Sequence, residues 1–598
     1  MSQFFDQASL VMVPSGYKDG GKVYSQKPLS TDGELTFTRA TSATRVGPDG
    51  LFEKVRTNEV LYSEDLTNAA WGNFSITVGA NATTAPNGTT TADKLTPTTS
   101  NTNHLIHSNV ITSAGEYSFS VYVKAAGYSK VGLRESQSVG FFATFDLTSG
   151  TILDSSTSQT NTITSVGDGW YRITSTRSYS GGINLGLIPL EDSYTSGQPL
   201  AAYAGDGTSG IFAWGAQMEF NVPTDYVGPT TSAAVSVGPV ANLLRLDYLG
   251  SSCPRLLLEP QRTNVLTYSE QIDNAAWTKF GSTITANSTT SPDGYTNADK
   301  VVEDTSTGAH GSYNVASVTT ATAYTWSGFF KASERTKVRI IAQTADTPTA
   351  IYNLSNGTVE STSGSITASI VSFGNGWYRC IATTTSSGTT GFFNWSMLDA
   401  SGDVTYTGDG TSGLFAWGCS IEAGAEASSY INTLGAAVTR GADFANKGGI
   451  SSLFGATEGT FFCELTYTNI NSIPIFLQSS VSSSFNQASY LQMGGNKVTY
   501  NVYSGGSQQV GITSTSNFTE GQNLKIAIVY KANDFVIYIN GVSEGAVSSG
   551  SISNSLTAIQ IGRWDDAGST FQYFGRISQA ILFPTRLSNA DLATLTTI

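Results

Sequence analysis

The chain has 598 residues, too many for a single hydrophobic core, so its length indicates three or four domains. Only 13% of the residues are charged, about half the usual share, whereas the 11% that are aromatic exclude a disordered chain. The net charge of −14 and the lack of a basic run argue against nucleic acid as a partner, and no apolar run reaches membrane-spanning length, so we expect no membrane insertion.

The first 45 residues contain one short apolar run, at 9–13, with no basic segment before it. This run is too short for the core of a signal peptide, so we expect no signal peptide. The chain as a whole is nevertheless rich in Ser, Thr, Asn and Gly, a composition typical of extracellular or virion β-proteins. We assign residues 1–45 to a separate N-terminal segment.

A duplication follows this segment. RTNEVLYSEDLTNAAW at 56–71 recurs as RTNVLTYSEQIDNAAW at 262–277, and GDGWYR at 167–172 recurs as GNGWYR at 374–379. Landmarks that recur in order over such a length indicate tandem domains, because solenoid repeats have periods of only about 20–50 residues. We predict that Trp71 and Trp277 occupy equivalent positions, and likewise Trp214 and Trp417.

Each repeat has the pattern of β-structure. In YSFSVYVKA at 117–125, apolar residues alternate with polar ones, which predicts a half-buried strand, and YTWSGFFKA at 324–332 is its counterpart. Polar turns rich in Gly, Ser, Thr and Asn separate such segments, and no long helical pattern intervenes. The sequence therefore predicts jelly-roll-like β-sandwiches at 46–240 and 241–445.

Both repeats contain GDGTSG, which has the Gly-x-Gly-x-x-Gly spacing of a dinucleotide-binding loop. Here the glycines lead into IFAW and LFAW, which favour strands rather than the helix that a nucleotide site needs. A tight turn at the Asp-Gly pair is the simplest interpretation. A calcium-binding loop stays open as an alternative, because the carboxylates of Asp206 and Asp409 can bind a hard cation.

The duplication ends near residue 448. The sequence then predicts a strand at 461–467, a hairpin of strands 523–530 and 535–540, and a strand at 575–583. Ser588, with Asp591 three residues later, forms a capping-box signature ahead of apolar residues. A short terminal helix is expected there.

Three segments of this last part carry a resemblance: EGTFFCELTY (458–467), FVIYINGV (535–542) and GRISQAILFPTRLSNADL (575–592). In this order they resemble the laminin-G/concanavalin-A-like sandwich, and we assign residues 446–598 to that fold. The resemblance implies carbohydrate binding. The family also includes glycosidases, but their E-x-D-x-x-E motif is absent from the sequence, so we expect no enzyme.

The repeat motifs RTN, NAAW, GWYR and GDGTSGLFAWG resemble β-sandwich repeats in tail and head-fibre proteins of tailed bacteriophages. This resemblance covers most of residues 40–445. It implies a virion protein, made in the host cytoplasm, whose residues 1–45 attach it to other virion proteins. Such appendages are commonly oligomers, and weak glycan sites gain strongly from multivalency, so we expect a homo-oligomer, a trimer.

Other chemistry finds little support. His104 and His107 do not form a zinc motif, and no G-x-S-x-G elbow indicates a serine nucleophile. The four cysteines contain no C-x-x-C pair. Two of them, Cys380 and Cys419, replace Ile and Ala of the first repeat, so we expect small buried hydrophobes there.

The tryptophans and a cluster near the C-terminus are the candidate glycan contacts. Trp214 and Trp417 alternate with phenylalanines on predicted strands and are expected in the core. Trp170 and Trp377 lie beside turns, where an indole can form a sugar platform, with core packing as the alternative. The remaining candidates follow the predicted strand 558–561 in a rim loop, where an aromatic face beside polar ligands suits a saccharide: Trp564, Asp565, Asp566 and Tyr573. The alternative is that Trp564 packs against Tyr573 and Phe574.

Together these patterns predict an all-β protein: tandem jelly-roll-like β-sandwiches followed by a concanavalin-A/laminin-G-like sandwich. The predicted function is non-covalent adhesion of a bacteriophage appendage to host or environmental glycans. A structural spacer without ligand and a glycan-degrading tail enzyme are the alternatives. No cofactor is expected apart from the open possibility of a structural calcium ion.

Overall fold

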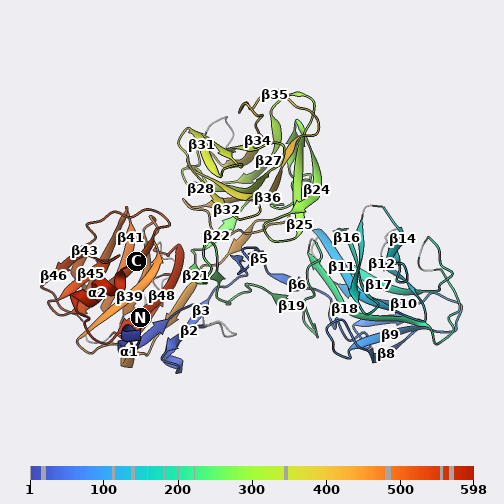
Figure 1. The fold of residues 1–598 in the computed structure, drawn as a ribbon, viewed down its shortest axis with the longest axis horizontal. Helices are drawn as coiled ribbons and strands as arrows, with labels where there is room; N and C mark the ends of the chain where they lie inside the picture. The colour runs from blue at the N-terminus through green and yellow to red at the C-terminus, as the bar shows by residue number, and fades with distance from the viewer. Residues whose placement is uncertain are drawn as a thin grey trace. The chain divides into compact units, whose positions relative to one another are not determined.

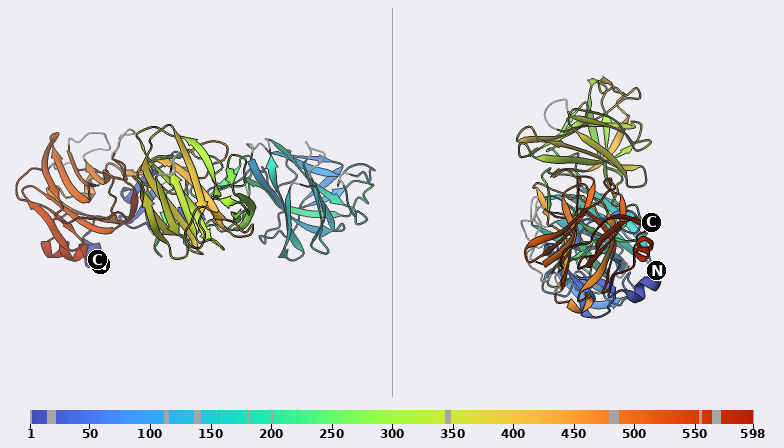
Figure 2. Two further views of the ribbon diagram at one scale, coloured as in Figure 1. Left: turned by 90° about the horizontal axis from the view of Figure 1, so that it is seen from above. Right: turned by 90° about the vertical axis from the view of Figure 1, so that its left-hand side faces the viewer.

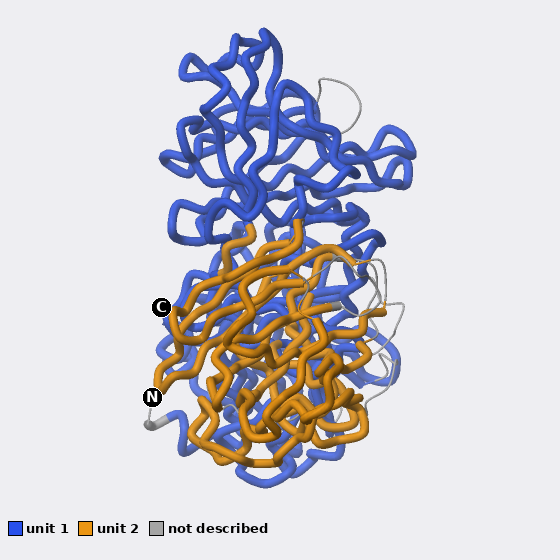
Figure 3. The backbone as a smooth tube through the Cα atoms, turned by 90° about the vertical axis from the view of Figure 1, so that its right-hand side faces the viewer, with its two compact units in different colours: residues 1–54, 239–294, 298–598 blue, residues 55–238, 295–297 orange. Residues whose placement is uncertain are grey.

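A computed structural model of the chain describes residues 2–14, 22–110, 115–135, 142–157, 159–179, 182–197, 199, 201–220, 222–342, 348–478, 487–552, 556–563 and 571–597. The chain divides into two compact units (Figure 3). Unit 1 comprises residues 1–54, 239–294 and 298–598, and unit 2 comprises residues 55–238 and 295–297. In the described part of the chain, no helix is both long and apolar enough to cross a membrane.

Unit 2 is the first sandwich, in which two six-stranded antiparallel sheets enclose one apolar core. Phe119, Val121 and Val123 of the predicted strand 117–125 are buried in this core, but Ser118 and Ser120 are buried as well, so the strand is confirmed and its predicted half-burial is wrong at these positions. One sheet has the order β14 (Thr151–Ser155), β13 (Phe142–Asp146), β12 (Lys130–Glu135), β17 (Ile183–Leu190), β10 (Leu105–Val110), β7 (Trp71–Phe74). The other has the order β15 (Thr160–Gly167), β16 (Trp170–Tyr179), β11 (Gly115–Ala126), β18 (Gly210–Phe220), β9 (Ala92–Pro97), β8 (Ile76–Thr83), and β6 (Arg56–Asn58) pairs with β19 (Val235–Val237).

The second sandwich, in unit 1, repeats this strand order position by position. Trp71 Nε1 donates to the Tyr62 carbonyl at 3.0 Å, and Trp277 Nε1 donates to the Tyr268 carbonyl at 2.9 Å. The duplication is therefore confirmed in topology and in this detail. One sheet is β24 (Ser282–Thr290), β25 (Thr296–Glu303), β36 (Gly413–Ala423), β28 (Ala323–Ala332), β33 (Trp377–Thr385), β32 (Thr367–Ser372), with β22 (Arg262–Asn264) and β37 (Val438–Arg440) attached. The other is β23 (Thr278–Phe280), β27 (His310–Ser317), β34 (Thr390–Met397), β29 (Lys337–Ala342), β30 (Thr349–Asn353), β31 (Thr358–Ser363), and β26 (Thr307–Gly308) pairs with β35 (Tyr406–Thr407).

The rest of unit 1 forms a third, terminal sandwich around its own apolar core (Figure 1). The predicted hairpin, the strand 575–583 and the terminal helix are all present, and the helix α2 (Asn589–Thr596) is capped by Ser588 Oγ, which accepts from Asp591 N at 3.1 Å. One half of the strand path is β43 (Ser507–Thr513), β42 (Lys497–Ser504), β41 (Gln487–Gly494), β40 (Ser472–Gln478), β47 (Ala558–Ile561), β38 (Phe444–Lys447), β3 (Glu34–Thr38), β2 (Lys22–Lys27). The other half is β1 (Leu10–Met12), β48 (Gly575–Phe583), β39 (Glu458–Thr466), β44 (Asn523–Lys531), β45 (Phe535–Ile539), β46 (Val542–Val547), with β21 (Arg255–Leu258) paired to β48 and β20 (Leu246–Asp247) to β21.

The N-terminal segment is part of this terminal sandwich, so the predicted domain boundary at residue 45 is wrong. Leu10 of β1 pairs with Leu582 of β48, and Thr36 of β3 pairs with Asn446 of β38. Leu35 is fully buried in the same core. The N-terminal strands therefore occupy positions inside the sheets, and the two chain ends lie side by side (Figure 2). The remaining short elements are α1 (Ser2–Gln7), η1 (Thr31–Gly33), β4 (Arg45–Val46), β5 (Phe52–Glu53) and η2 (Ser451–Leu453).

A buried charge network stands where the chain leaves the terminal sandwich and returns to it. Arg39 Nη1 donates to Asp443 Oδ1 at 3.2 Å, and Arg245 contacts both Asp443 and Glu259, the latter at 2.7 Å. Arg440 Nη1 lies 3.4 Å from a Glu259 oxygen. All five side chains are at most 4% exposed. Because buried charges are tolerated only when paired, the network fixes how these segments meet.

Candidate functional site

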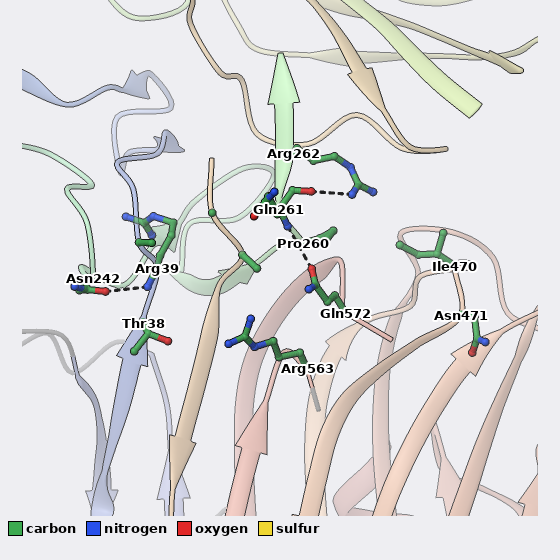
Figure 4. A pocket seen from close by; sticks show the side chains of 13 residues that line it. Thr38, Arg39, Asn242, Pro260, Gln261, Arg262, Ile470, Asn471, Arg563 and Gln572 are labelled. Carbon is green, nitrogen blue, oxygen red and sulfur yellow. Dashed lines mark hydrogen bonds between the residues drawn. The ribbon is translucent and has the colours of Figure 1, made fainter. Parts of the chain in front are cut away.

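A cleft of about 940 Å³ opens at the rim of the terminal sandwich (Figure 4). Its walls come from segments that are far apart in the sequence: Arg39 follows β3, Gln261 and Arg262 lie at the start of β22, and Arg563 follows β47. Gln572, just before β48, lines it as well. Strand ends thus supply most of its polar groups, and ligand-binding residues commonly occur at such loops.

Hydrogen bonds hold several of these groups in place. Gln572 Oε1 accepts from Gln261 N at 3.3 Å, and Arg262 Nη1 donates to the Gln261 carbonyl at 3.0 Å (Figure 4). The Arg563 guanidinium lies 4.6 Å from the ring centroid of Phe444, a cation–π contact that supports its position. The cleft therefore presents arginine and amide side chains whose positions are already restricted.

The charge of the cleft contrasts with that of the chain. Three arginines are among its described lining residues, and none of those residues is an aspartate or a glutamate. Arg39 is engaged in the buried network, whereas Arg262 and Arg563 are half-buried. Planar guanidinium groups bind carboxylates and sulfates through paired hydrogen bonds. The cleft is therefore suited to an anionic ligand, although the chain carries a net charge of −14.

A carboxylate lies close to one of these arginines. Burial, together with the negative charge of Glu520, raises the pKa of Glu426 to about 7, while the nearby Arg262 acts in the opposite direction. The charge state of Glu426 therefore changes near neutral pH, next to the cleft.

The predicted glycan contacts Trp564, Asp565 and Asp566 lie outside the described residues. Arg563, directly before the undescribed segment 564–570, and Gln572, the second residue after it, both line the cleft. The assignment of Trp564, Asp565 and Asp566 as glycan contacts therefore stays a prediction.

Tyr573, the fourth predicted contact in this cluster, is wrong as a glycan contact. Its side chain is fully buried, and its hydroxyl donates to the Thr466 carbonyl at 2.6 Å. Burial raises the pKa of this phenol. A ring inside the core cannot cover a sugar, so Tyr573 supports the fold of the rim rather than the ligand.

Trp170 and Trp377 are also wrong as exposed sugar platforms. They are 2% and 1% exposed, and their indole N–H groups donate to the carbonyls of Thr84 and Thr290 at 3.2 and 2.9 Å. The adjoining turns are built from residues with positive φ, which send the indoles inward. The predicted core positions of Trp214 and Trp417 are confirmed, since both are buried.

Asp206 and Asp409 form turns, as the Asp-Gly pairs indicated. Asp206 Oδ1 accepts from the backbone N–H groups of Thr208 and Ser209 at 2.7 and 2.6 Å, and Asp409 makes the same bonds to Thr411 and Ser412 at 2.7 Å each. These hydrogen bonds lower the pKa of both carboxyls. The described residues contain no cluster of three or more His, Cys, Asp or Glu that could hold a metal. The turn interpretation is therefore confirmed, and a calcium-binding role for Asp206 and Asp409 stays a prediction.

The buried cysteines and histidines have packing roles. Cys380 and Cys419 are fully buried, which confirms that they act as small apolar side chains, and burial raises the pKa of both thiols. His104 and His310 were not recognised as equivalent in the sequence. His104 lies 2.6 Å from the Ser75 carbonyl and 3.0 Å from the Tyr203 carbonyl, and His310 lies in the same way between Gly281 and Tyr406. The two histidines occupy matching positions in the two repeats, and this match is the feature of the sequence that indicates their equivalence.

The sequence also did not predict the charge network or the place of residues 44–54, which we call the arm and which precede the first sandwich in the chain. Both combine charged and apolar residues, as in LLRLDYL at 243–249, where Arg245 and Asp247 interrupt an apolar run. A charge within such a run signals a buried ion pair, but the sequence does not say which segment supplies the partner.

Comparison with known proteins supports the fold of the terminal sandwich. Residues 457–593 match the family described as the Concanavalin A-like lectin/glucanases superfamily. No curated protein matches the sequence.

Several solved structures resemble a quarter of the chain. The CBM40 domain of the Ruminococcus gnavus IT-sialidase, bound to alpha2,3 sialyllactose, is 12% identical, with a TM-score of 0.22, over 25% of this chain and 86% of that one. The SAP-like pentraxin from Limulus polyphemus is 15% identical, with a TM-score of 0.19, over 23% and 69%. The NanB sialidase from Streptococcus pneumoniae is 16% identical, with a TM-score of 0.22, over 25% of this chain and only 26% of its own. The family match shows that the terminal sandwich of this all-β chain is a concanavalin-A-like β-sandwich domain, as its hairpin and terminal elements predicted.

Proposed function

We propose that the chain is a non-enzymatic glycan-binding protein whose terminal sandwich binds a carboxylate- or sulfate-bearing glycan in the rim cleft. The observation that carries this proposal is the lining of the cleft, where Arg262 and Arg563 lie among amide side chains. The lectin-type fold of the domain supports it. Amides and guanidinium groups together can bind sugar hydroxyls and an acidic substituent.

The test uses the full chain, because the N-terminal strands belong to the terminal sandwich. We expect binding to acidic members of a glycan array and weaker binding to their neutral counterparts. Arg563→Gln should lower the affinity by roughly 10- to 100-fold, since hydrogen bonds to charged groups contribute about 1.5–3 kcal/mol. Arg262→Gln should also weaken binding.

Lys531→Gln is the matched control, because it removes one positive charge from the same domain at an exposed position outside the cleft lining. Equal affinities of the wild type and both arginine variants would refute the cleft assignment. A chain that binds no glycan at all would favour a structural spacer, and release of reducing sugar from a bound polysaccharide would favour an enzyme.

We propose further that this adhesion serves a bacteriophage particle, with the chain present as a trimer. The repeat motifs and the charge-poor composition support this setting. Electron micrographs of particles labelled with an antibody against the chain test the location, and light scattering of the full chain tests the oligomer. Particles without label would argue against the bacteriophage location. A monomer at micromolar concentration would argue against the trimer.

A further inference from the structure

We propose that the first sandwich carries a docking site for a segment of another protein in which an aromatic residue is followed two positions later by Lys. The proposal rests on a comparison within the chain. The equivalent site on the second sandwich is filled by Phe52 and Lys54 of this chain's own arm, residues 44–54.

In the filled site, the Phe52 ring enters an aromatic cluster of the second sandwich. It stacks on Phe373 with a centroid distance of 4.9 Å and meets Phe329 edge-on at 5.2 Å. Trp417 and Tyr430 complete the cluster at 6.2 and 6.4 Å. Phe52 is 6% exposed, so the arm is part of the core here.

The arm adds a charged contact next to this ring. Lys54 Nζ lies 2.9 Å from Glu270 and 2.6 Å from Asp293, and 5.2 Å from the ring centroid of Trp417. The backbone N–H of Phe52 donates to the Pro292 carbonyl at 2.9 Å. The site therefore recognises an aromatic side chain, a cation two residues later, and one backbone N–H.

The first sandwich has the same cluster at the equivalent strand positions. Tyr122 pairs with Trp214 across β11 and β18, as Phe329 pairs with Trp417 across β28 and β36. The ring centroids of Trp214 lie 5.3 Å from Tyr122 and 4.7 Å from Tyr226. Tyr226 corresponds to Tyr430, because each hydroxyl is hydrogen-bonded at 2.7 Å to the serine of the YSE motif.

On the first sandwich this cluster is open. Val166 occupies the position of Phe373 in the repeat and is 44% exposed. Tyr122 and Tyr226 are half-buried, whereas their counterparts in the filled site are fully buried. The core cluster around Trp214 is made of residues of the first sandwich alone, whereas its counterpart includes Val46 and Phe52 of the arm.

The adjoining glycines show the same difference. A Cβ added at Gly294, beside the filled site, would come within 2.8 Å of the arm residue Leu51. A Cβ added at the equivalent Gly88 would meet nothing within 4 Å. The space that the arm takes on the second sandwich is therefore free on the first.

The charges of the open site select the partner. Glu64 corresponds to Glu270 and keeps a carboxylate for a Lys or Arg, while Asn87 replaces Asp293. The chain's own arm is already seated on the second sandwich, so the occupant is another protein. Aromatic stacking beside a carboxylate matches an aromatic–x–Lys segment.

The probe is a fluorescein-labelled synthetic peptide with residues 48–58 of this chain, PDGLFEKVRTN, titrated with the full-length protein and followed by anisotropy. Glu64→Gln should weaken binding about tenfold, as expected for loss of a charge-assisted contact. Val166→Phe restores the missing stacking partner and should tighten binding about threefold to tenfold. Asp225→Asn, an exposed aspartate of the same sandwich, is the matched control and should change nothing.

Peptides with Ala in place of the Phe or of the Lys should bind at least tenfold more weakly than the parent peptide. Equal binding by wild type and the Glu64→Gln variant would overturn the proposal. So would the absence of binding to both the wild type and the Val166→Phe variant, since the latter carries the site in its most complete form. Glycan binding at the terminal sandwich is measured separately and does not affect this outcome.

Discussion

Replacing Asp443 with Asn tests whether the buried charge network holds unit 1 together. The carboxylate of Asp443 contacts Arg39 at 3.2 Å and Arg245 at a shorter distance, and accepts from Glu259 N at 3.0 Å. Arg440 lies 3.6 Å away. Asp443→Asn keeps the size of the side chain but removes one of the two negative charges facing three arginines.

The expected cost follows from this geometry. The five groups carry a net charge of +1, which the substitution raises to +2 in a site with almost no solvent contact. Two unit charges about 4 Å apart interact by about 4 kcal/mol at an effective dielectric constant of about 20. The variant no longer buries the carboxylate, which offsets part of this loss. We therefore expect unit 1 to lose about 3–5 kcal/mol of unfolding free energy, as when other buried ion pairs are broken.

Differential scanning calorimetry of the full chain measures this effect. The transition of unit 1 should move down by about 3–6 °C, while that of unit 2 stays in place. Asp225→Asn, an exposed aspartate in unit 2, is the matched control and should leave both transitions unchanged. A loss of less than about 1 kcal/mol in the unfolding free energy of unit 1 would show that the network does not stabilise this unit and would refute the reasoning.

Three further predictions follow from the same structure. Burial and Glu520 raise the pKa of Glu426 to about 7, above its unfolded value of about 4.5, so this group favours folding below pH 4.5 and loses that contribution as the pH rises through 7. Glu426→Gln should therefore raise the unfolding free energy at pH 8 relative to wild type by about 1–3 kcal/mol and have little effect at pH 4. Equal changes at both pH values would contradict this. Phe52→Ala should cost about 3–5 kcal/mol in calorimetry because it empties an aromatic cavity, and a cost below about 1 kcal/mol would mean that the arm is not seated. A fragment of residues 446–598 should lack a cooperative thermal transition and a near-ultraviolet circular dichroism signal, because it misses β1, β2, β3 and most contacts of β38. Cooperative unfolding of the fragment at the same temperature as the full chain would show that these strands are dispensable.

Local patterns in the sequence predicted the strands and their turns well. The hairpin of β44 and β45 turns at Asn533, which has a positive φ, and the helix α2 is capped by Ser588, both as their residue types indicate. The duplication predicted that the two sandwiches share one topology. For the turn and the cap, a few adjacent residues carry the whole signal, whereas the duplication is read from landmarks that recur in order along the chain.

The partners of the strands could not be predicted in the same way. The apolar residues of β1 show that it is buried, but period-2 patterns do not name a neighbour, and Leu10 pairs with a residue more than 500 positions away. The tryptophans beside the GDG and GNG turns show a second limit. A turn residue predicts an exposed backbone, yet the indoles of Trp170 and Trp377 point inward and bond to carbonyls of a neighbouring loop.

The candidate cleft falls under the same limit. Arg262 belongs to the start of the second repeat and Arg563 to the terminal strands, about 300 residues apart in the chain. Their approach depends on how the connecting segments return to the terminal sandwich. Residue types alone could not predict that Arg262 and Arg563 line the same cleft.

The position of the charge network also bears on how the chain folds. The N-terminal strand β1 pairs with β48, so the terminal sandwich cannot close until β48 has been synthesised. The two main sheets of each repeat sandwich consist of strands of that repeat alone and can form earlier, because folding of non-local sheets is slowed by the loops they must close. Arg39 directly follows the N-terminal strands of the terminal sandwich, and Asp443 directly precedes its C-terminal strands. Both repeats lie between these two residues in the sequence. The ion pair of Arg39 and Asp443 forms only when the two halves of the terminal sandwich meet, which makes it a late contact that stabilises the closed terminal sandwich.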